Sequence, residues 1–127
     1  MPQITSAQPN FFILYVDNPP ASAAFYAGLL GRPPIEASAT FGMFALDSGV
    51  MLGLWSKHTV EPAAAAGGGG AEVAFSVDGK AAVDALHARW SDKRVPMLQA
   101  PCQMDFGYTF VALDPDGHRL RVFAPGA

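Results

Sequence analysis

The chain has 127 residues, half of them hydrophobic, and its 8 basic against 11 acidic residues give a formal net charge of −3. This length supplies one domain built on one core or on two small modules, and it excludes two independent large domains. No basic run could follow a phosphate backbone, which excludes nucleic acid as a partner. The apolar run at 11–16 is too short for a signal-peptide core or a membrane span, so we expect a cytoplasmic protein. The single cysteine, Cys102, has no partner for a disulfide or a zinc site.

The first predicted strand ends in ILYVDN (13–18), and a helical pattern follows it. Asn18 suits the N-cap of that helix, the prolines at 19 and 20 suit its first turn, and Gly31 suits its end. The segment FGMFALDSGVMLGLW (41–55) then reads as a hairpin with a glycine-containing turn. We expect the helix to lie on the surface and to pack through three apolar side chains, Phe25, Leu29 and Leu30.

Residues 61–71, EPAAAAGGGGA, offer no core side chain and predict a flexible linker. After the linker the pattern repeats. AFSVDG (74–79) matches the first strand end at an offset of 61, and Asp78 then takes the N-cap place. The segment at 106–123 matches the first hairpin at an offset of 67 to 68. The apolar face of the second helix comprises Val83, Leu86 and Trp90. The repeat predicts an α+β fold of two βαβββ modules, at about 10–58 and 72–125, within a single domain spanning 1–127.

The duplicated βαβββ order, the helix end AFYAGLLG and the turn DPDGH before the last strand together resemble the glyoxalase / bleomycin-resistance / extradiol-dioxygenase superfamily, also called vicinal oxygen chelate proteins. The resemblance implies a cupped mixed sheet around a cleft, often completed by a second chain, so we expect a homodimer. In metal-dependent members, His, Gln or Glu ligands stand on the first and last strands of each module. The resemblance carries these four ligand positions to Phe11, Gly53, Glu72 and Arg121.

Of the residues at these ligand positions, only Glu72 can bind a metal ion, because phenylalanine, glycine and a permanently charged guanidinium offer no lone pair to a cation. The three histidines, His58, His87 and His118, stand on different elements with no shared spacing. The serines lie in no nucleophile motif. We therefore predict no metal, no cofactor and no catalytic residue, and a binding protein is favoured over an enzyme.

Strand alternation predicts which side chains share the cleft. Met51 and Trp55 fall on the face of Gly53, while Ile13 and Tyr15 fall on the face of Phe11. A glycine within an apolar strand favours close approach by a flat ligand, and a bulge or sheet bend is the alternative. Trp55 either stacks on such a ligand or belongs to a core or a dimer interface.

The segment QMDFGYTF (103–110) supplies a second predicted wall, because alternation places four of its side chains on one face: Met104, Phe106, Tyr108 and Phe110. Arg121 either pairs with Glu72 or anchors an anionic ligand, for which a carboxylate is the natural match.

Three segments, LGLWSKH, DFGYTF and DPDGHRLRVFAP, resemble a narrower branch, the phenazine-antibiotic-resistance or griseoluteate-binding proteins. That resemblance implies a metal-free protein that sequesters a planar aromatic antibiotic by stacking. One alternative is a metal-dependent lyase or dioxygenase-like enzyme with an altered site. The other is an enzyme-associated or regulatory module, or a metal-free isomerase that uses Glu72 as its base. The predicted ligand-binding residues are Trp55, Arg121, Glu72, Phe106, Met51, Gly53, Phe11, Tyr108, Phe110 and Phe44.

Overall fold

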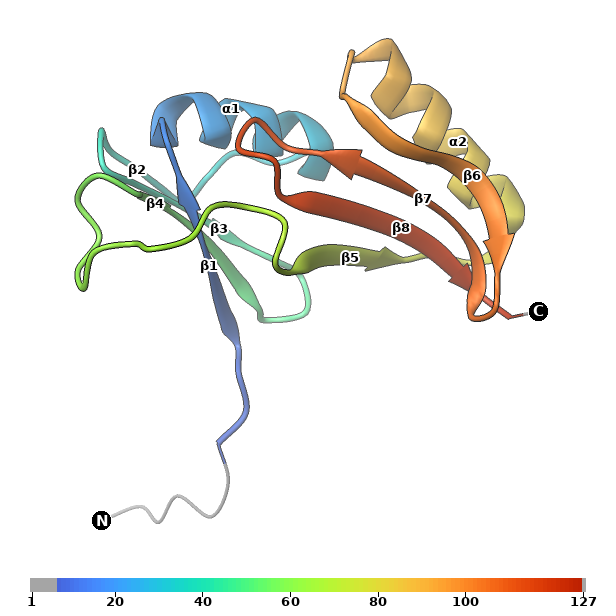
Figure 1. Ribbon diagram of the computed structural model, residues 1–127, viewed down its shortest axis with the longest axis horizontal. Helices are drawn as coiled ribbons and strands as arrows, with labels where there is room; N and C mark the ends of the chain where they lie inside the picture. Colours follow the sequence, from blue (N-terminus) through green and yellow to red (C-terminus); the bar gives the residue numbers. More distant parts are fainter. Residues whose placement is uncertain (1–6, 127) are drawn as a thin grey trace. The chain divides into compact units, whose positions relative to one another are not determined.

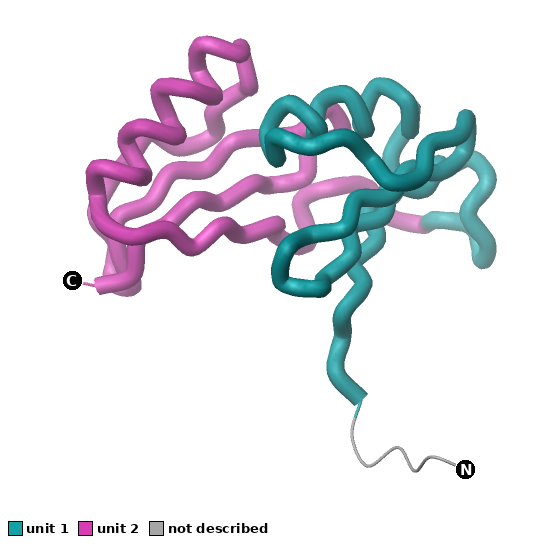
Figure 2. Tube along the Cα trace, turned by 180° about the vertical axis from the view of Figure 1, so that it is seen from behind, with its two compact units in different colours: residues 1–64 teal, residues 65–127 magenta. Residues whose placement is uncertain are grey.

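The computed structural model describes residues 7–126 and divides into two compact units, residues 1–64 and 65–127 (Figure 2). The division lies inside the predicted linker. The first unit contains β1 (Phe11–Val16), α1 (Pro19–Leu30), β2 (Glu36–Ala37), β3 (Phe41–Ala45) and β4 (Met51–Ser56). The second contains β5 (Glu72–Ser76), α2 (Gly79–Asp92), β6 (Met97–Met104), β7 (Gly107–Leu113) and β8 (Arg119–Pro125).

Each unit forms a four-stranded mixed sheet with one helix on one face (Figure 1). The strand orders are β1-β4-β3-β2 and β5-β8-β7-β6, so the second unit repeats the first strand for strand. The first strand of each unit pairs in parallel with the last, and the remaining pairs are antiparallel. The predicted α+β fold of two βαβββ modules is confirmed.

Helix α1 begins and ends where its sequence predicts. The Asn18 side chain accepts a hydrogen bond from the backbone N–H of Ala21 at 3.1 Å, and Gly31 closes the helix with a φ of 69°. The predicted packing face is wrong, however. Phe25, Leu29 and Leu30 are only half-buried, whereas the buried residues follow an i, i+3, i+4, i+7 pattern: Pro19, Ser22, Ala23 and Tyr26.

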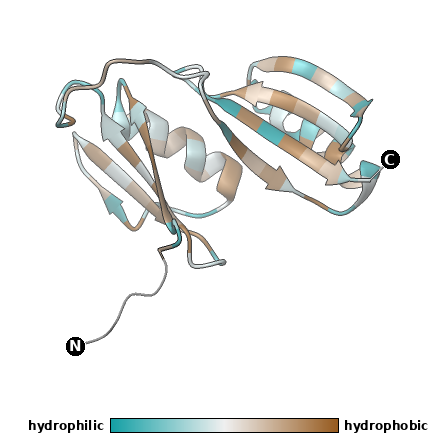
Figure 3. Ribbon diagram, turned by 60° about the horizontal axis from the view of Figure 1, so that its bottom comes forward, coloured by the Kyte–Doolittle hydropathy of each residue, from teal (hydrophilic) through white to brown (hydrophobic). Residues whose placement is uncertain are grey.

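The core of each unit lies between its helix and its sheet. In the first unit Phe44, Leu52 and Leu54 point to the helix side, where an added Cβ on Gly42 would meet Ala23 of α1 at 3.5 Å. The hydrophobic strand stretches of both units are visible in Figure 3. Phe44 has no exposed surface, so its prediction as a ligand-contacting residue is wrong: alternation turns it under α1.

In the second unit Trp90 of α2 is the centre of the core. Its ring packs edge-on against Phe75 and Phe110, with centroid distances of 5.4 Å each. His87 is half-buried, with its ring 5.2 Å from that of Phe110. Asp78 stands at the N-cap but makes no side-chain capping bond. Neither helix is long and apolar enough to span a membrane, as far as residues 7–126 are concerned.

Candidate functional site

The sheet face of the first unit that α1 does not cover is almost entirely apolar. Parallel pairing sets Phe11, Ile13 and Tyr15 beside Met51, Gly53 and Trp55, and the antiparallel hairpin adds the next strand. We call this the aromatic face; its residues are Phe11, Ile13, Tyr15, Phe41, Met43, Met51, Gly53 and Trp55. The alternation predicted from the sequence is confirmed for β1 and β4.

Gly53 lies at the centre of the aromatic face beneath neighbouring side chains. An added Cβ there would stand 2.9 Å from Cε1 of Phe11, 3.1 Å from Cζ of Phe41 and 3.4 Å from Cγ1 of Ile13. The absent side chain thus lets two rings close over the strand. Strand β4 pairs in regular register on both sides of Gly53, so the alternative of a bulge is wrong.

Much of the aromatic face is open. Phe11, Ile13 and Tyr15 on the edge strand β1 are each about two-fifths exposed, with values of 40%, 43% and 42%. Trp55 is half-buried and meets Phe41 edge-on, with ring centroids 6.2 Å apart and planes at 83°. Exposed aromatic surface that is held in place by neighbouring rings is typical of a surface that binds another flat apolar group.

In the second unit, the sheet face that α2 does not cover carries polar side chains next to aromatic ones. Arg121 holds Glu72 in a two-point contact, Nε to Oε1 at 2.7 Å and Nη2 to Oε2 at 3.0 Å. Its Nη1 donates to Oγ1 of Thr109 at 3.2 Å, and that hydroxyl donates to the carbonyl of Val122 at 2.8 Å. We call Glu72, Thr109, Arg121, Phe106 and Phe123 the Arg121 cluster.

One ring of the Arg121 cluster lies against its guanidinium, and the second ring packs against the first. The ring of Phe106 lies 5.6 Å from Cζ of Arg121 and meets Phe123 edge-on at 5.9 Å. Phe106 is nevertheless 44% exposed. A ring that touches a cation on one side and solvent on the other offers a stacking surface.

The ion pair sets the chemistry that Glu72 can perform. Hydrogen bonds from Arg121 hold the pKa of Glu72 below its usual range and raise the pKa of the guanidinium. A general base for neutral pH needs a raised carboxyl pKa. The isomerase alternative, in which Glu72 abstracts a proton, is therefore disfavoured. Of the two readings of Arg121, the structure shows the pairing with Glu72.

The predicted second wall is wrong in part, because a turn at Asp105 and Phe106 separates β6 from β7 and breaks the alternation. Phe106 joins the uncovered face, but Tyr108 and Phe110 turn toward α2. The Tyr108 hydroxyl donates to Asp84 of that helix at 2.8 Å, which raises the pKa of the phenol. Phe110 has no exposed surface. Neither residue lies on the side of the Arg121 cluster.

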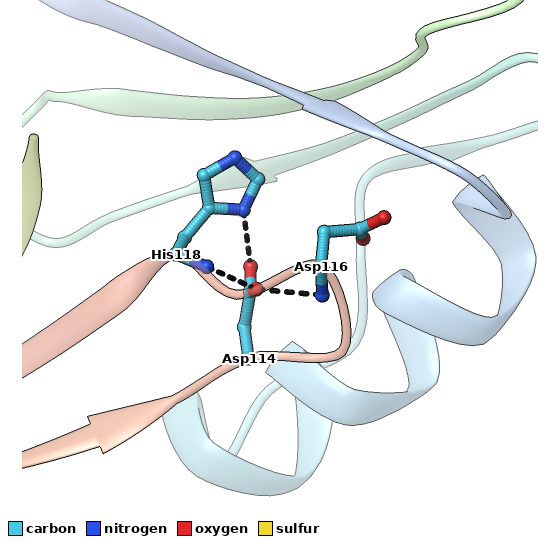
Figure 4. Close-up of side chains that lie close together, drawn as sticks. All are labelled: Asp114, Asp116 and His118. Atoms are coloured by element: carbon cyan, nitrogen blue, oxygen red, sulfur yellow. Dashed lines mark hydrogen bonds and ion pairs between the residues drawn. The ribbon is translucent and has the colours of Figure 1, made fainter. Parts of the chain in front are cut away.

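One group of acid and histidine side chains within residues 7–126 is close enough to hold a metal ion: Asp114, Asp116 and His118, in the turn between β7 and β8 (Figure 4). The buried carboxylate of Asp114 accepts from the backbone N–H groups of Asp116 and His118, at 2.8 Å each, and lies 2.7 Å from Nδ1 of His118. The Asp116 carboxylate points away from it. These hydrogen bonds hold the turn between β7 and β8 in place, and we call the three residues the turn clasp.

A family model described as the Glyoxalase/Bleomycin resistance protein/Dioxygenase superfamily matches residues 8–122. The chain belongs to this superfamily. The solution NMR structure of protein ATC0852 from Agrobacterium tumefaciens is 56% identical, covers 96% of this chain and 100% of that one, and superposes with a TM-score of 0.88. A glyoxalase-related enzyme from Fulvimarina pelagi shares the fold at 21% identity and a TM-score of 0.81, with coverage of 92% and 87%.

A relative of named function is the phenazine antibiotic resistance protein EhpR of Enterobacter agglomerans. It is 28% identical over 117 residues, which cover 90% of this chain and 89% of EhpR. The resemblance to the superfamily is thus confirmed, and that to its phenazine-resistance branch gains a relative spanning both modules.

The residues at the four positions that the resemblance assigns to metal ligands do not fit a divalent metal ion. Phe11 and Gly53 contact each other within the first unit and offer no donor atom. In the second unit Arg121 brings a positive charge, and both oxygens of Glu72 already accept from it. A metal ion there would replace an ion pair and stand beside a guanidinium.

Sequence reasoning missed Phe41 and Thr109. Phe41 lies opposite Trp55 in the β3–β4 hairpin, and pairing that hairpin residue by residue would have placed it on the aromatic face. Thr109 has no exposed surface and links Arg121 to the β8 backbone. Alternation through Val111, which pairs with Arg121, was the available signal for it.

Proposed function

We propose that this protein binds a planar aromatic compound of the phenazine type without metal and without turnover, and so acts by sequestration. The observation that carries the proposal is the aromatic face, where the exposed rings around Gly53 offer stacking area. EhpR, named for phenazine resistance, supports the ligand class. A cytoplasmic location, where Cys102 stays reduced, is part of the proposal.

Stacking and apolar burial would provide the affinity. At about 0.3 kcal/mol per heavy atom, a ligand of about 20 heavy atoms gains roughly −6 kcal/mol, which corresponds to a dissociation constant of some tens of micromolar. Capture at that strength protects a cell only if the protein is abundant, because each molecule removes one ligand. A stoichiometric complex whose ligand is recovered unchanged is therefore expected.

The test is a calorimetric titration of EDTA-treated protein with phenazine-1-carboxamide. We expect saturable micromolar binding, and about tenfold weaker binding for Trp55→Ala and Phe11→Ala, which each remove one stacking ring. Phe12→Ala is the matched control, because Phe12 is the next residue on β1, is 51% exposed and points to the other side of the sheet. No saturable binding, or equal losses in all three variants, would contradict the proposal.

Homodimerisation belongs to the same proposal. The exposed apolar side chains lie on β1, an edge strand of its sheet, and edge strands pair readily with a second chain. Sedimentation equilibrium with and without the ligand tests this. A monomer in both conditions would contradict the dimer while leaving ligand binding to be judged by calorimetry.

A further inference from the structure

We propose that the Arg121 cluster selects neutral planar aromatic ligands that carry a hydrogen-bond acceptor, and rejects the corresponding carboxylates. The inference rests on the proposed function and narrows its ligand class. It runs against the ordinary expectation for an arginine beside a stacking ring such as Phe106 of the second unit, which is to anchor an anion.

The first argument is that the donors of Arg121 are largely taken. A guanidinium has five N–H donors. The hydrogen bonds to Glu72 and Thr109 use three of them, and Nη1 and Nη2 keep one each. The two-point contact that a ligand carboxylate needs is already made by Glu72. A single carbonyl oxygen or ring nitrogen can still accept from Nη1 or Nη2.

The second argument concerns charge. Glu72 neutralises Arg121, and the side chains of the pair are only 32% and 18% exposed. A ligand carboxylate would either face Glu72 as a like charge or displace it, leaving a half-buried carboxylate without its partner. Both outcomes cost binding energy that a neutral ligand of the same shape does not lose. Selectivity of this kind comes from the unfavourable contact with the wrong ligand.

One further cation stands near the pair. Arg119 lies two residues before Arg121 on β8, pairs in register with Glu72, and adds to the lowering of the pKa of that carboxyl. It is exposed, so salt screens its attraction for an anionic ligand. The selectivity should therefore be measured at a salt concentration of about 0.15 M, which is close to the physiological ionic strength.

Phe106 supplies the reason why a planar ligand would lie close to this pair. Its ring covers one side of the Arg121 guanidinium and remains 44% exposed. A ligand stacked on Phe106 has its edge near the two remaining N–H donors. The position of an acceptor on that edge then decides whether the ligand is held or repelled.

The experiment compares two probes of equal shape, phenazine-1-carboxamide and phenazine-1-carboxylate, by calorimetry at pH 7.5, where a carboxylic acid is ionised. We expect the wild-type protein to bind the carboxylate at least about tenfold more weakly. Glu72→Gln keeps an oxygen for Arg121 and removes the negative charge, so the preference should shrink to about twofold or reverse.

Two control variants separate this local effect from general changes in charge. Asp84→Asn removes one negative charge on α2, on the other side of the same sheet, and should keep the tenfold preference. Arg119→Gln should also keep it.

Equal or tighter binding of the carboxylate by the wild type overturns the selectivity and leaves the proposed function standing. This comparison uses the wild-type protein alone, so it does not depend on whether any variant folds. A preference that Glu72→Gln leaves unchanged also overturns it. Failure of both probes to bind overturns the proposed function, and the selectivity with it.

Discussion

The turn between β7 and β8 depends on one buried carboxylate, that of Asp114. Replacing this residue measures how much the hydrogen bonds of the turn contribute to the stability of the protein. The Asp114 side chain has no exposed surface and accepts hydrogen bonds from two backbone N–H groups and from His118. Asp114→Ala removes all three. Each lost hydrogen bond costs about 1 kcal/mol if water can hydrogen-bond to the groups left without a partner. We therefore expect a loss of about 3 kcal/mol in the free energy of unfolding.

Asp114→Asn separates the backbone bonds from the ion pair. The amide oxygen still accepts from both N–H groups, so the loss should be about 1 kcal/mol near pH 6. The hydrogen bond to Asp114 raises the pKa of His118 above its ordinary value of 6.5. A raised pKa in the folded state means that the extra stability is fully present below pH 6.5 and is lost as the pH rises through the folded value. The cost of Asp114→Asn should therefore be smaller at pH 9 than at pH 6.

The assay is urea denaturation of the wild type and the two variants at both pH values. The midpoints are compared on condition that the dependence of the unfolding free energy on urea concentration is the same for all three proteins. His58→Gln is the matched control: its partner Asp17 is also 2.7 Å away, but both side chains are more than 60% exposed, at 61% and 64%. Solvent and salt screen that pair, so the control should change stability very little. Equal losses for Asp114→Asn and Asp114→Ala, or a pH-independent cost of Asp114→Asn, would refute the reasoning.

Three further predictions compare single substitutions on the two sheets. Gly107→Ala should cost more than about 3 kcal/mol, because its Cβ would stand 2.1 Å from the carbonyl oxygen of Ala124 at a φ of 151°; a small midpoint shift in urea would contradict this. Gly53→Ala should cost less than about 1 kcal/mol in the same assay, because the contact is the movable end of the Phe11 ring. Glu72→Gln should lower the unfolding midpoint more at pH 7 than at pH 3, since the pKa of Glu72 is lowered in the folded state and that stability is lost as the pH falls; equal shifts at both pH values would argue against it.

The repeated order of elements was readable from the sequence because each element is marked locally. Asn18 and Gly31 bound the first helix with chemistry that acts within a few residues. The face of that helix was not readable in the same way. Leu29 and Leu30 are the more hydrophobic residues, but the small side chains of Ser22 and Ala23 let α1 approach the sheet closely around Gly42. Close packing thus overrides hydrophobicity, and only the three-dimensional fit reveals it.

The candidate site was predictable where strands are regular and unpredictable across a turn. Alternation placed Met51, Gly53 and Trp55 together because β4 has no irregularity. It failed at Tyr108, because the turn before Gly107 shifts the parity of every later residue on β7. The pairing of Glu72 with Arg121 stayed open in the sequence because two strands had to be set in register first. The structure supplies that register, with Glu72 beside Arg119 and Ala74 beside Arg121.

The four ligand positions of the superfamily are filled here as two matched pairs. Within the first unit the Phe11 ring lies where a side chain at Gly53 would be, so each residue suits the other. Within the second unit Glu72 and Arg121 satisfy each other through two hydrogen bonds. A single substitution toward a metal ligand would break one pair and leave a clash or an unpaired charge, while the other pair still offered no donor. The residues at these positions are therefore stabilised within each unit separately, and this supports the proposed metal-free binding over a site that one substitution would convert to metal chemistry.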